Sequence, residues 1–245
     1  MTRQRVADIH RGWETLPFAG MEAFFGVGRI MILAPHADDE SLGCGGLIAQ
    51  CCRYNRPPVI VFVTDGTGSH PNSPSTPPAA LRRLREAEAE EALRRLGHDD
   101  PDAIIFLGLR DTAAPHHGPV FNAAMARISL LAKGCTTICA PWHHDPHCDH
   151  VATDLLAQGV AACTGMRHLS YPVWGWTLPP QLEIDEPPVD GIRLNIADVL
   201  PAKKTAIAAY RSQLGKIIHD DPSGFELPAN LLHVFERPFE VYLKP

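Results

Sequence analysis

The stretch Ile30-Met31-Ile32-Leu33-Ala34 is apolar throughout and runs directly into Pro35-His36-Ala37-Asp38-Asp39-Glu40. A short apolar run that stops at polar residues predicts a buried strand. A second such run, 136–140, leads into Asp145-Pro146-His147-Cys148-Asp149-His150. Each of these two strands is therefore expected to present histidine and carboxylate side chains beyond its carboxyl end.

Around these two runs, short β-branched segments alternate with longer helical patterns. This alternation is typical of βαβ units around a parallel sheet. The sequence thus predicts an α/β, Rossmann-like fold with a mostly parallel sheet flanked by helices. The expected strands are 29–34, 58–64, 102–107, 136–140, 167–173, 190–196 and a last one in the tail 231–243. The expected helices are 42–55, 79–97, 119–133, 150–164 and 199–214, and the Pro-rich segments 71–78 and 178–188 are expected to be loops.

Composition limits the class of protein. A chain of 245 residues with 45% hydrophobic residues is long enough for one well-buried core, so we expect a single α/β domain over 1–245, with its core at about 29–215. The net charge of −6 argues against a nucleic-acid partner. Seven cysteines and a start without an apolar segment indicate a reduced, cytoplasmic protein, and no apolar stretch is long enough for a transmembrane segment.

Topology predicts that the two polar motifs meet. Ligands of open α/β sheets bind beyond the carboxyl ends of the strands, where the strand order reverses. In the common order 3-2-1-4-5 this reversal lies between strands 1 and 4, and the two motifs follow these strands. We therefore expect a metal site at the carboxyl ends of strands 1 and 4.

The spacing of the motifs suggests which side chains bind a metal ion and which one accepts a proton. If a helix starts here, His36 and Asp39 lie three residues apart on one side, and Asp38 points elsewhere. His150, in the first turn of the next helix, is the candidate third ligand. Three such ligands leave a fourth position on Zn²⁺ for water, and a neighbouring carboxylate such as Asp38 is placed to take its proton. Fe²⁺ is an alternative ion for this donor set.

Two features of the same region have simpler explanations. Acidic and hydroxyl residues such as Asp39, Glu40 and Ser41 commonly cap a helix, and this is the alternative to a metal site. The segment Gly43-Cys44-Gly45-Gly46 lacks the spacing of a dinucleotide-binding loop. Close packing of the helix on the sheet is the better explanation for these glycines.

With these residues the chain resembles the PIG-L/LmbE-like family of metal-dependent N-deacetylases, which act on N-acetylglucosaminyl compounds. The family motif Ala/Pro-His-Pro-Asp-Asp-Glu reads Pro35-His36-Ala37-Asp38-Asp39-Glu40 here, and His-Pro-Asp-His reads His147-Cys148-Asp149-His150. Both departures replace a loop proline and leave the polar side chains in place. The resemblance continues through Thr64-Asp65-Gly66-Thr67-Gly68, Arg85 with Glu88, Leu107-Gly108-Leu109-Arg110-Asp111 and Tyr210-Arg211-Ser212-Gln213.

The resemblance implies a role for each residue of the motifs. His36, Asp39 and His150 would bind zinc, and Asp38 would be the general base. His147 would stabilise the oxyanion or protonate the leaving amine, with Asp149 tuning the charge of His147. Candidate substrate contacts are Arg85, Asp111, His144, Trp174 and Trp176.

Several of these contacts have structural alternatives. Arg85 could be a solvated helix residue paired with Glu88. Trp174 and Trp176 could be packing residues, and the adjacent histidines 143 and 144 could simply be solvated.

The expected function is hydrolysis of an amide. The resemblance implies removal of the acetyl group from an N-acetylated amino sugar, a GlcNAc-type glycoside or glycolipid precursor, by attack of zinc-activated water. An amidase for another acyl group and a noncatalytic metal- or ligand-binding module are the alternatives. Asp38 and His147 argue against the noncatalytic module, because neither is needed merely to hold a cation.

Overall fold

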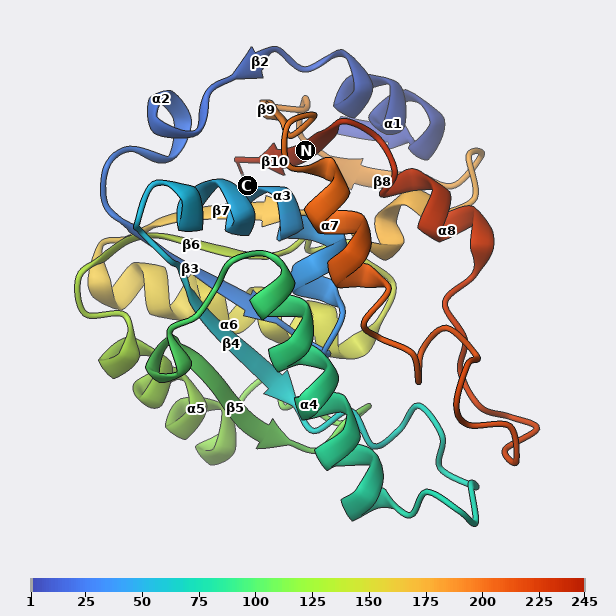
Figure 1. The fold of residues 1–245 in the computed structure, drawn as a ribbon. Helices are drawn as coiled ribbons and strands as arrows, with labels where there is room; N and C mark the ends of the chain where they lie inside the picture. The colour runs from blue at the N-terminus through green and yellow to red at the C-terminus, as the bar shows by residue number, and fades with distance from the viewer. Residues whose placement is uncertain (1, 245) are drawn as a thin grey trace.

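The computed structural model describes residues 2–244 and contains two sheets and eight α-helices over this range (Figure 1). The strands of the main sheet are β2 (Phe18–Ala19), β3 (Arg29–Ala34), β4 (Val59–Thr64), β5 (Ile104–Leu109), β6 (Cys135–Pro141), β7 (Arg167–Tyr171), β9 (Gly191–Asn195) and β10 (Phe239–Leu243). A small second sheet pairs β1 (Thr2–Arg5) antiparallel with β8 (Glu183–Glu186). The α-helices are α1 (Val6–Thr15), α2 (Met21–Phe25), α3 (Asp39–Arg53), α4 (Pro78–Arg95), α5 (Pro119–Leu131), α6 (Cys148–Thr164), α7 (Leu200–Ile207) and α8 (Ala229–Val234).

The strand order confirms the expected topology. The main sheet runs β2-β9-β10-β7-β6-β3-β4-β5, and its β5-β4-β3-β6-β7 part is the predicted order 3-2-1-4-5 with all neighbours parallel. The order reverses between β3 and β6, which are hydrogen-bonded neighbours. The two polar motifs therefore follow adjacent strands and leave the same edge of the sheet.

The central strands are buried on both faces because alternate side chains enter two different cores. Ile30 and Ile32 of β3 pack with α3, α4 and α7, whereas Met31 and Leu33 pack with α5 and α6. Figure 1 shows these two groups of helices on opposite sides of the sheet. A third cluster joins Trp13 of α1 to Trp142 and to β10.

Outside this central part the structure differs from several expectations. The tail 231–243 is not one strand, because α8 occupies its first residues and only β10 is extended. The expected loop 178–188 contains β8, whose partner β1 is distant in sequence. The helix expected at 199–214 ends at Ile207, and the one expected at 42–55 already begins at Asp39. Local patterns missed β8 because its pairing with β1, which is distant in the chain, defines it.

Between residues 2 and 244, no helix has the length and apolar character needed to cross a bilayer.

The glycines of α3 allow close packing, as their sequence suggested. A Cβ atom on Gly43 would lie 2.2 Å from Cδ2 of Tyr171, and one on Gly46 would lie 2.3 Å from Cγ2 of Ile196. Tyr171 is fully buried and its hydroxyl donates to the Leu33 carbonyl at 2.7 Å, so the ring has little freedom to move. These glycines therefore set the distance between α3 and its neighbours.

We expect Gly43→Ala to lower the free energy of unfolding by about 1–3 kcal/mol, the usual cost of overpacking a core. Gly20→Ala is the matched control, because nothing lies within 4 Å of a Cβ atom at that position. Urea denaturation of both variants measures the difference. Equal stability of Gly43→Ala and the wild type would contradict a packing role for this glycine.

Candidate metal centre and active site

The first motif forms a tight turn between β3 and α3. The backbone N–H of His36 donates to Asp39 Oδ2 at 3.0 Å, and the N–H of Asp39 donates to the His36 carbonyl at 3.3 Å. His36 therefore precedes the helix, and Asp39 is its first residue. Asp38 between them has a φ of 146°, a backbone conformation that is costly for a residue with a side chain. Such strain is most often found at functional sites.

Three donor atoms converge at this turn. Asp39 Oδ2 lies 3.2 Å from His36 Nδ1 and 3.3 Å from His150 Nε2. Donors of a tetrahedral zinc site with bonds of about 2.0–2.1 Å lie about 3.3 Å apart. His150 is fully buried, and its Nε2 atom has no hydrogen-bond partner among the described residues. The two contacts of Asp39 and this unpaired nitrogen fit a metal ion near His36, Asp39 and His150. A group of three donor atoms that lie within 4.8 Å of one another is formed by His36, His147 and His150.

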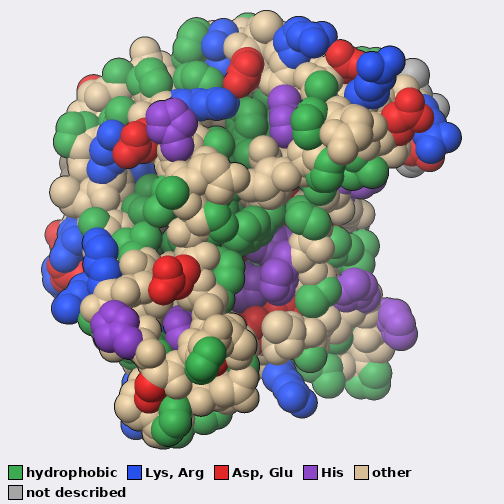
Figure 2. All heavy atoms as spheres, turned by 90° about the vertical axis from the view of Figure 1, so that its right-hand side faces the viewer, with side chains coloured by type: hydrophobic (Ala, Val, Ile, Leu, Met, Phe, Trp, Pro, Cys, Tyr) green, Lys and Arg blue, Asp and Glu red, His purple; other side chains and the backbone are tan. Residues whose placement is uncertain are grey.

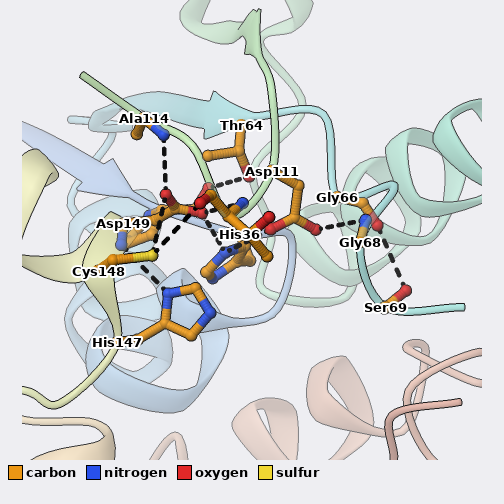
Figure 3. A network of polar contacts seen from close by, with 12 residues as sticks. His36, Thr64, Gly66, Gly68, Ser69, Asp111, Ala114, His147, Cys148 and Asp149 are labelled. Carbon is orange, nitrogen blue, oxygen red and sulfur yellow. Dashed lines mark hydrogen bonds and ion pairs between the residues drawn. The ribbon is translucent and has the colours of Figure 1, made fainter. Parts of the chain in front are cut away.

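The other nitrogen of each imidazole contacts a carboxylate. Asp145 Oδ2 lies 2.9 Å from His150 Nδ1, and the Asp145 carboxylate also accepts the backbone N–H groups of residues 173–175. His36 Nε2 lies 3.2 Å from both Asp111 Oδ1 and Asp149 Oδ2, and Figure 3 shows His36 between these two residues. A carboxylate behind a ligating histidine fixes the ring and its tautomer.

The two outer carboxylates near His36 are themselves fixed by backbone groups. Asp149 accepts the N–H groups of Thr112 at 2.7 Å and Ala114 at 3.0 Å, and Asp111 accepts that of Gly68 at 2.8 Å (Figure 3). The imidazole of His36 is thus held in place by contacts from three segments, which are the loop after β4, the loop after β5 and the start of α6. The side chain of Asp149 contacts His36 directly, and its negative charge also acts to raise the pKa of His147.

The electrostatic field of the cluster favours a cation. Burial acts to lower the pKa of His36, but Asp111, Asp149 and Asp39 outweigh it and hold this pKa well above its usual value. Burial also opposes the shift of His150, whose pKa Asp39 and Asp145 raise to about 9. Excess negative charge around two imidazoles is the environment that stabilises a divalent ion.

Asp38 lies beside the donor set without joining it. Its Oδ2 is 3.4 Å from Nη2 of Arg85, a residue that also donates to the carbonyls of Gly66 and Ala37. Burial, with the adjacent charge of Asp39, raises the pKa of Asp38 above its usual range, and Arg85 opposes the rise. A carboxylate with a raised pKa is a better proton acceptor near neutral pH than an ordinary one.

Glu40, the last residue of the first motif, supports the turn from within the protein. It is fully buried and accepts the backbone N–H of Asp38 at 3.1 Å, the hydroxyl of Ser41 at 2.5 Å and the hydroxyl of Tyr210. Asp39 and Glu40 thus accept backbone N–H groups at the start of α3, while no side-chain cap bond forms at Asp38. The contacts of a helix start and the cluster of donor atoms occur together at this turn.

His147 faces the donor set from the second motif. Its donor atom lies within 4.8 Å of those of His36 and His150, and its ring centroid is 4.6 Å from that of His36. The backbone N–H of Asp149 donates to His147 Nδ1 at 3.2 Å, which leaves Nε2 as the position of the proton. Burial and the two neighbouring histidines lower the pKa of His147, so a neutral imidazole with an Nε2–H donor is favoured.

A cavity of about 140 Å³ opens beside these groups. Figure 2 shows the hollow, with histidine in its wall and acidic side chains at its floor. The predicted site residues that line the cavity are His36, Asp38, Asp39, Arg85, Asp111, His147 and Trp174.

The remaining predicted residues lie elsewhere. Asp149 and His150 are buried behind the cavity wall. His144 turns toward Glu186, and Trp176 packs on Trp13 with ring centroids 4.7 Å apart. The structure does not bring His144 and Trp176 to the cavity.

The motifs along the rest of the chain also meet here. Arg85 is 3% exposed and is not paired with Glu88, which instead accepts from the N–H and hydroxyl of Ser212 at 2.8 and 2.6 Å. Gln213, which follows Ser212, lines the cavity, and its Oε1 atom has no hydrogen-bond partner among the described residues.

Sequence reasoning missed the roles of Asp145, Gln213 and Glu40. All three lie inside motifs that were recognised, but their partners are distant in the chain.

The comparison with known proteins agrees with this arrangement. The sequence model described as PIG-L, GlcNAc-PI de-N-acetylase, matches residues 31–161. A diacetylchitobiose deacetylase from Thermococcus kodakarensis is 27% identical over 157 residues, which are 63% of this chain. The chain spans 57% of the length of that relative.

Solved structures share the fold at lower identity. The zinc-inhibited form of the teicoplanin deacetylase Orf2 superposes with a TM-score of 0.66 at 15% identity and covers 88% of this chain and 97% of its own. The 4-carboxy-2-hydroxymuconate hydratase GalB from Pseudomonas putida KT2440 gives a TM-score of 0.57 at 17% identity, covering 78% and 81%. The fold alone therefore does not identify the reaction that this chain catalyses. The match over residues 31–161, which includes both motifs, shows that this chain belongs to the PIG-L family of de-N-acetylases.

Proposed function

We propose that the protein is a metal-dependent hydrolase that removes the acetyl group from an N-acetylated amino sugar, such as a GlcNAc-type glycoside or glycolipid precursor. The observation that carries this proposal is the strained, buried Asp38 beside the donor set of His36, Asp39 and His150. A site that only held a cation would need neither the strain nor a second carboxylate. The matching deacetylases support the amide as the bond that is cleaved.

Zinc, when bound, would supply Lewis acidity that lowers the pKa of a coordinated water to about 7 and polarises a carbonyl. Asp38 takes the proton of the attacking water on a carboxylate oxygen and later returns it to the amine that leaves. Arg85, 3.4 Å from Asp38 Oδ2, holds this carboxylate toward the cavity. His147 donates Nε2–H to the oxyanion that forms as the amide carbonyl is attacked.

The shape of the cavity supports a small substrate with an apolar face and several hydroxyls. Trp174, Phe225 and Leu227 add apolar groups to the lining of the cavity, and Arg85 and Gln213 add polar groups. A pyranose ring has both kinds of surface, since its C–H face packs on an aromatic ring and its hydroxyls reach polar partners. The acyl group would then lie over His36 and Asp38.

The two tryptophans of this region should behave differently when each is replaced by alanine. Trp174→Ala is expected to raise KM about 10-fold with little loss of stability, because the ring lines the cavity. Trp176→Ala is expected to leave KM unchanged and to lower stability on the order of 2 kcal/mol, because its ring packs on Trp13 and Arg237. Steady-state kinetics and thermal melting of both variants test this, and equal KM values would remove Trp174 from the substrate site.

The function itself is tested by incubating zinc-loaded protein with a panel of N-acetylglucosaminides and measuring free amine. The panel includes N-propionyl and N-butyryl analogues, and Asp38→Ala is the control. Amine release from N-acetyl substrates by the wild type alone supports the proposal. Preference for a bulkier acyl group would indicate an amidase of different specificity. Bound metal without release from any substrate would favour a noncatalytic protein.

A further inference from the structure

A second cluster of histidine and carboxylate side chains lies outside the site described above. His143 and His144 follow β6, and Glu186 ends β8. Their donor atoms lie within 4.8 Å of one another, and Glu186 Oε2 is 3.0 Å from His143 Nε2 and 3.2 Å from His144 Nε2. These spacings are close to the separation of about 3.3 Å between donors of a tetrahedral zinc site.

The side chain of Glu186 is mostly buried. It is 9% exposed, against 33% for His143 and 30% for His144. One carboxylate oxygen, Oε1, accepts from Trp142 Nε1 at 3.1 Å. The other, Oε2, is buried, and it contacts the nitrogens of His143 and His144. A carboxylate with one oxygen fixed by a hydrogen bond and the other directed at two imidazoles has the arrangement of a metal ligand.

The cluster holds more donor atoms than one ion pair uses. The rings of His143 and His144 have centroids 4.1 Å apart, and the Nε2 atoms of both rings approach the same oxygen, Glu186 Oε2. A single divalent ion would be bound by both imidazole nitrogens and by the carboxylate at once. His144 Nε2 also lies 3.2 Å from the carbonyl of Asp185, which offers a further oxygen beside the cluster.

We propose that His143, His144 and Glu186 form a second binding site for a divalent transition-metal ion such as Zn²⁺, independent of the proposed catalytic centre. The donor set of two imidazoles and one carboxylate suits this class of ion and leaves a fourth position for water. A bound ion would link the loop 142–147, which carries Asp145 and His147, to the small β1–β8 sheet. The site thus goes beyond the proposed function and has its own test.

Untagged protein is equilibrated with buffered Zn²⁺, passed through a desalting column and analysed for zinc and protein. The wild type is expected to hold two zinc ions per chain and Glu186→Gln to hold one. Asp39→Ala, which impairs the first centre, is expected to keep one ion, and the double variant Asp39→Ala/Glu186→Gln is expected to keep none. The Gln side chain retains the oxygen that accepts from Trp142, so Glu186→Gln should fold normally.

A matched control comes from the second pair of adjacent histidines, His116 and His117, which are exposed and belong to no donor cluster among the described residues. The variant His116→Asn/His117→Asn should keep both ions, whereas His143→Asn/His144→Asn should keep one. Zinc should also raise the melting temperature of Asp39→Ala but not of the double variant Asp39→Ala/Glu186→Gln. Two ions in Glu186→Gln, or none in Asp39→Ala, would overturn the second site without affecting the proposal for Asp38.

Discussion

Asp39→Ala is expected to abolish zinc binding at the first centre together with activity, whereas Asp38→Asn is expected to keep the zinc and lose about 10²–10⁴-fold in kcat. Asp39 Oδ2 contacts a nitrogen of both His36 and His150, so its removal takes away the oxygen that joins the donor set. Asp38 contacts Arg85 instead and can lose its charge without disturbing the donors.

The measurement is zinc content and amine release for both variants, made in the Glu186→Gln background so that only the first centre contributes zinc. Asparagine is chosen at position 38 because it preserves shape and, like aspartate, tolerates a positive φ better than most residues. Equal loss of zinc from both variants would show that the assignment of ligand and base is wrong.

His147→Ala is expected to lower kcat by about 10²–10³-fold with zinc retained, the usual cost of removing one oxyanion donor. His147 Nδ1 is occupied by the Asp149 backbone N–H, so only Nε2 can serve the substrate. The reduction should appear mainly in kcat, because the hydrogen bond strengthens as charge develops on the substrate oxygen.

The zinc content of His147→Ala distinguishes a role of His147 as oxyanion donor from a role as metal ligand. His147 lies close enough to His36 and His150 to act as a ligand itself, and loss of zinc in His147→Ala would assign it to the donor set. His117→Ala is the matched control, because His117 is exposed and should affect neither zinc nor kcat. An unchanged kcat in His147→Ala would exclude it as the oxyanion donor.

The central fold could be predicted because its signals are local. The apolar run 30–34 and its counterpart at 136–140 are short, bounded by polar residues and separated by helical patterns, and such segments leave few alternatives to a parallel sheet. The strand order then placed His36 and His150 at one edge. The small second sheet was harder to predict, because β8 and β1 are defined only by pairing with each other across the chain.

Side-chain direction was the part that the sequence could not supply. Trp174 and Trp176 are two residues apart, yet only Trp174 reaches the cavity, because a 3₁₀ turn (Trp174–Thr177) sends the next ring onto α1. Likewise His144 and His147 share one loop, and Asp145 between them turns inward to bind His150. Adjacent loop residues have no fixed periodicity, so only their packing partners decide where each one points.

By itself, the sequence determined the α/β architecture, the edge where the motifs meet and the chemical types of side chain available there, because these follow from local patterning and from the geometry of parallel sheets. Only the tertiary structure decided which atoms converge. The contact between His36 Nε2 and Asp149 spans 113 positions of the chain, and that between Glu186 and His143 joins a strand of the small sheet to the loop after β6. Distances of about 3 Å between such residues depend on the packing of the whole core, which no local pattern encodes.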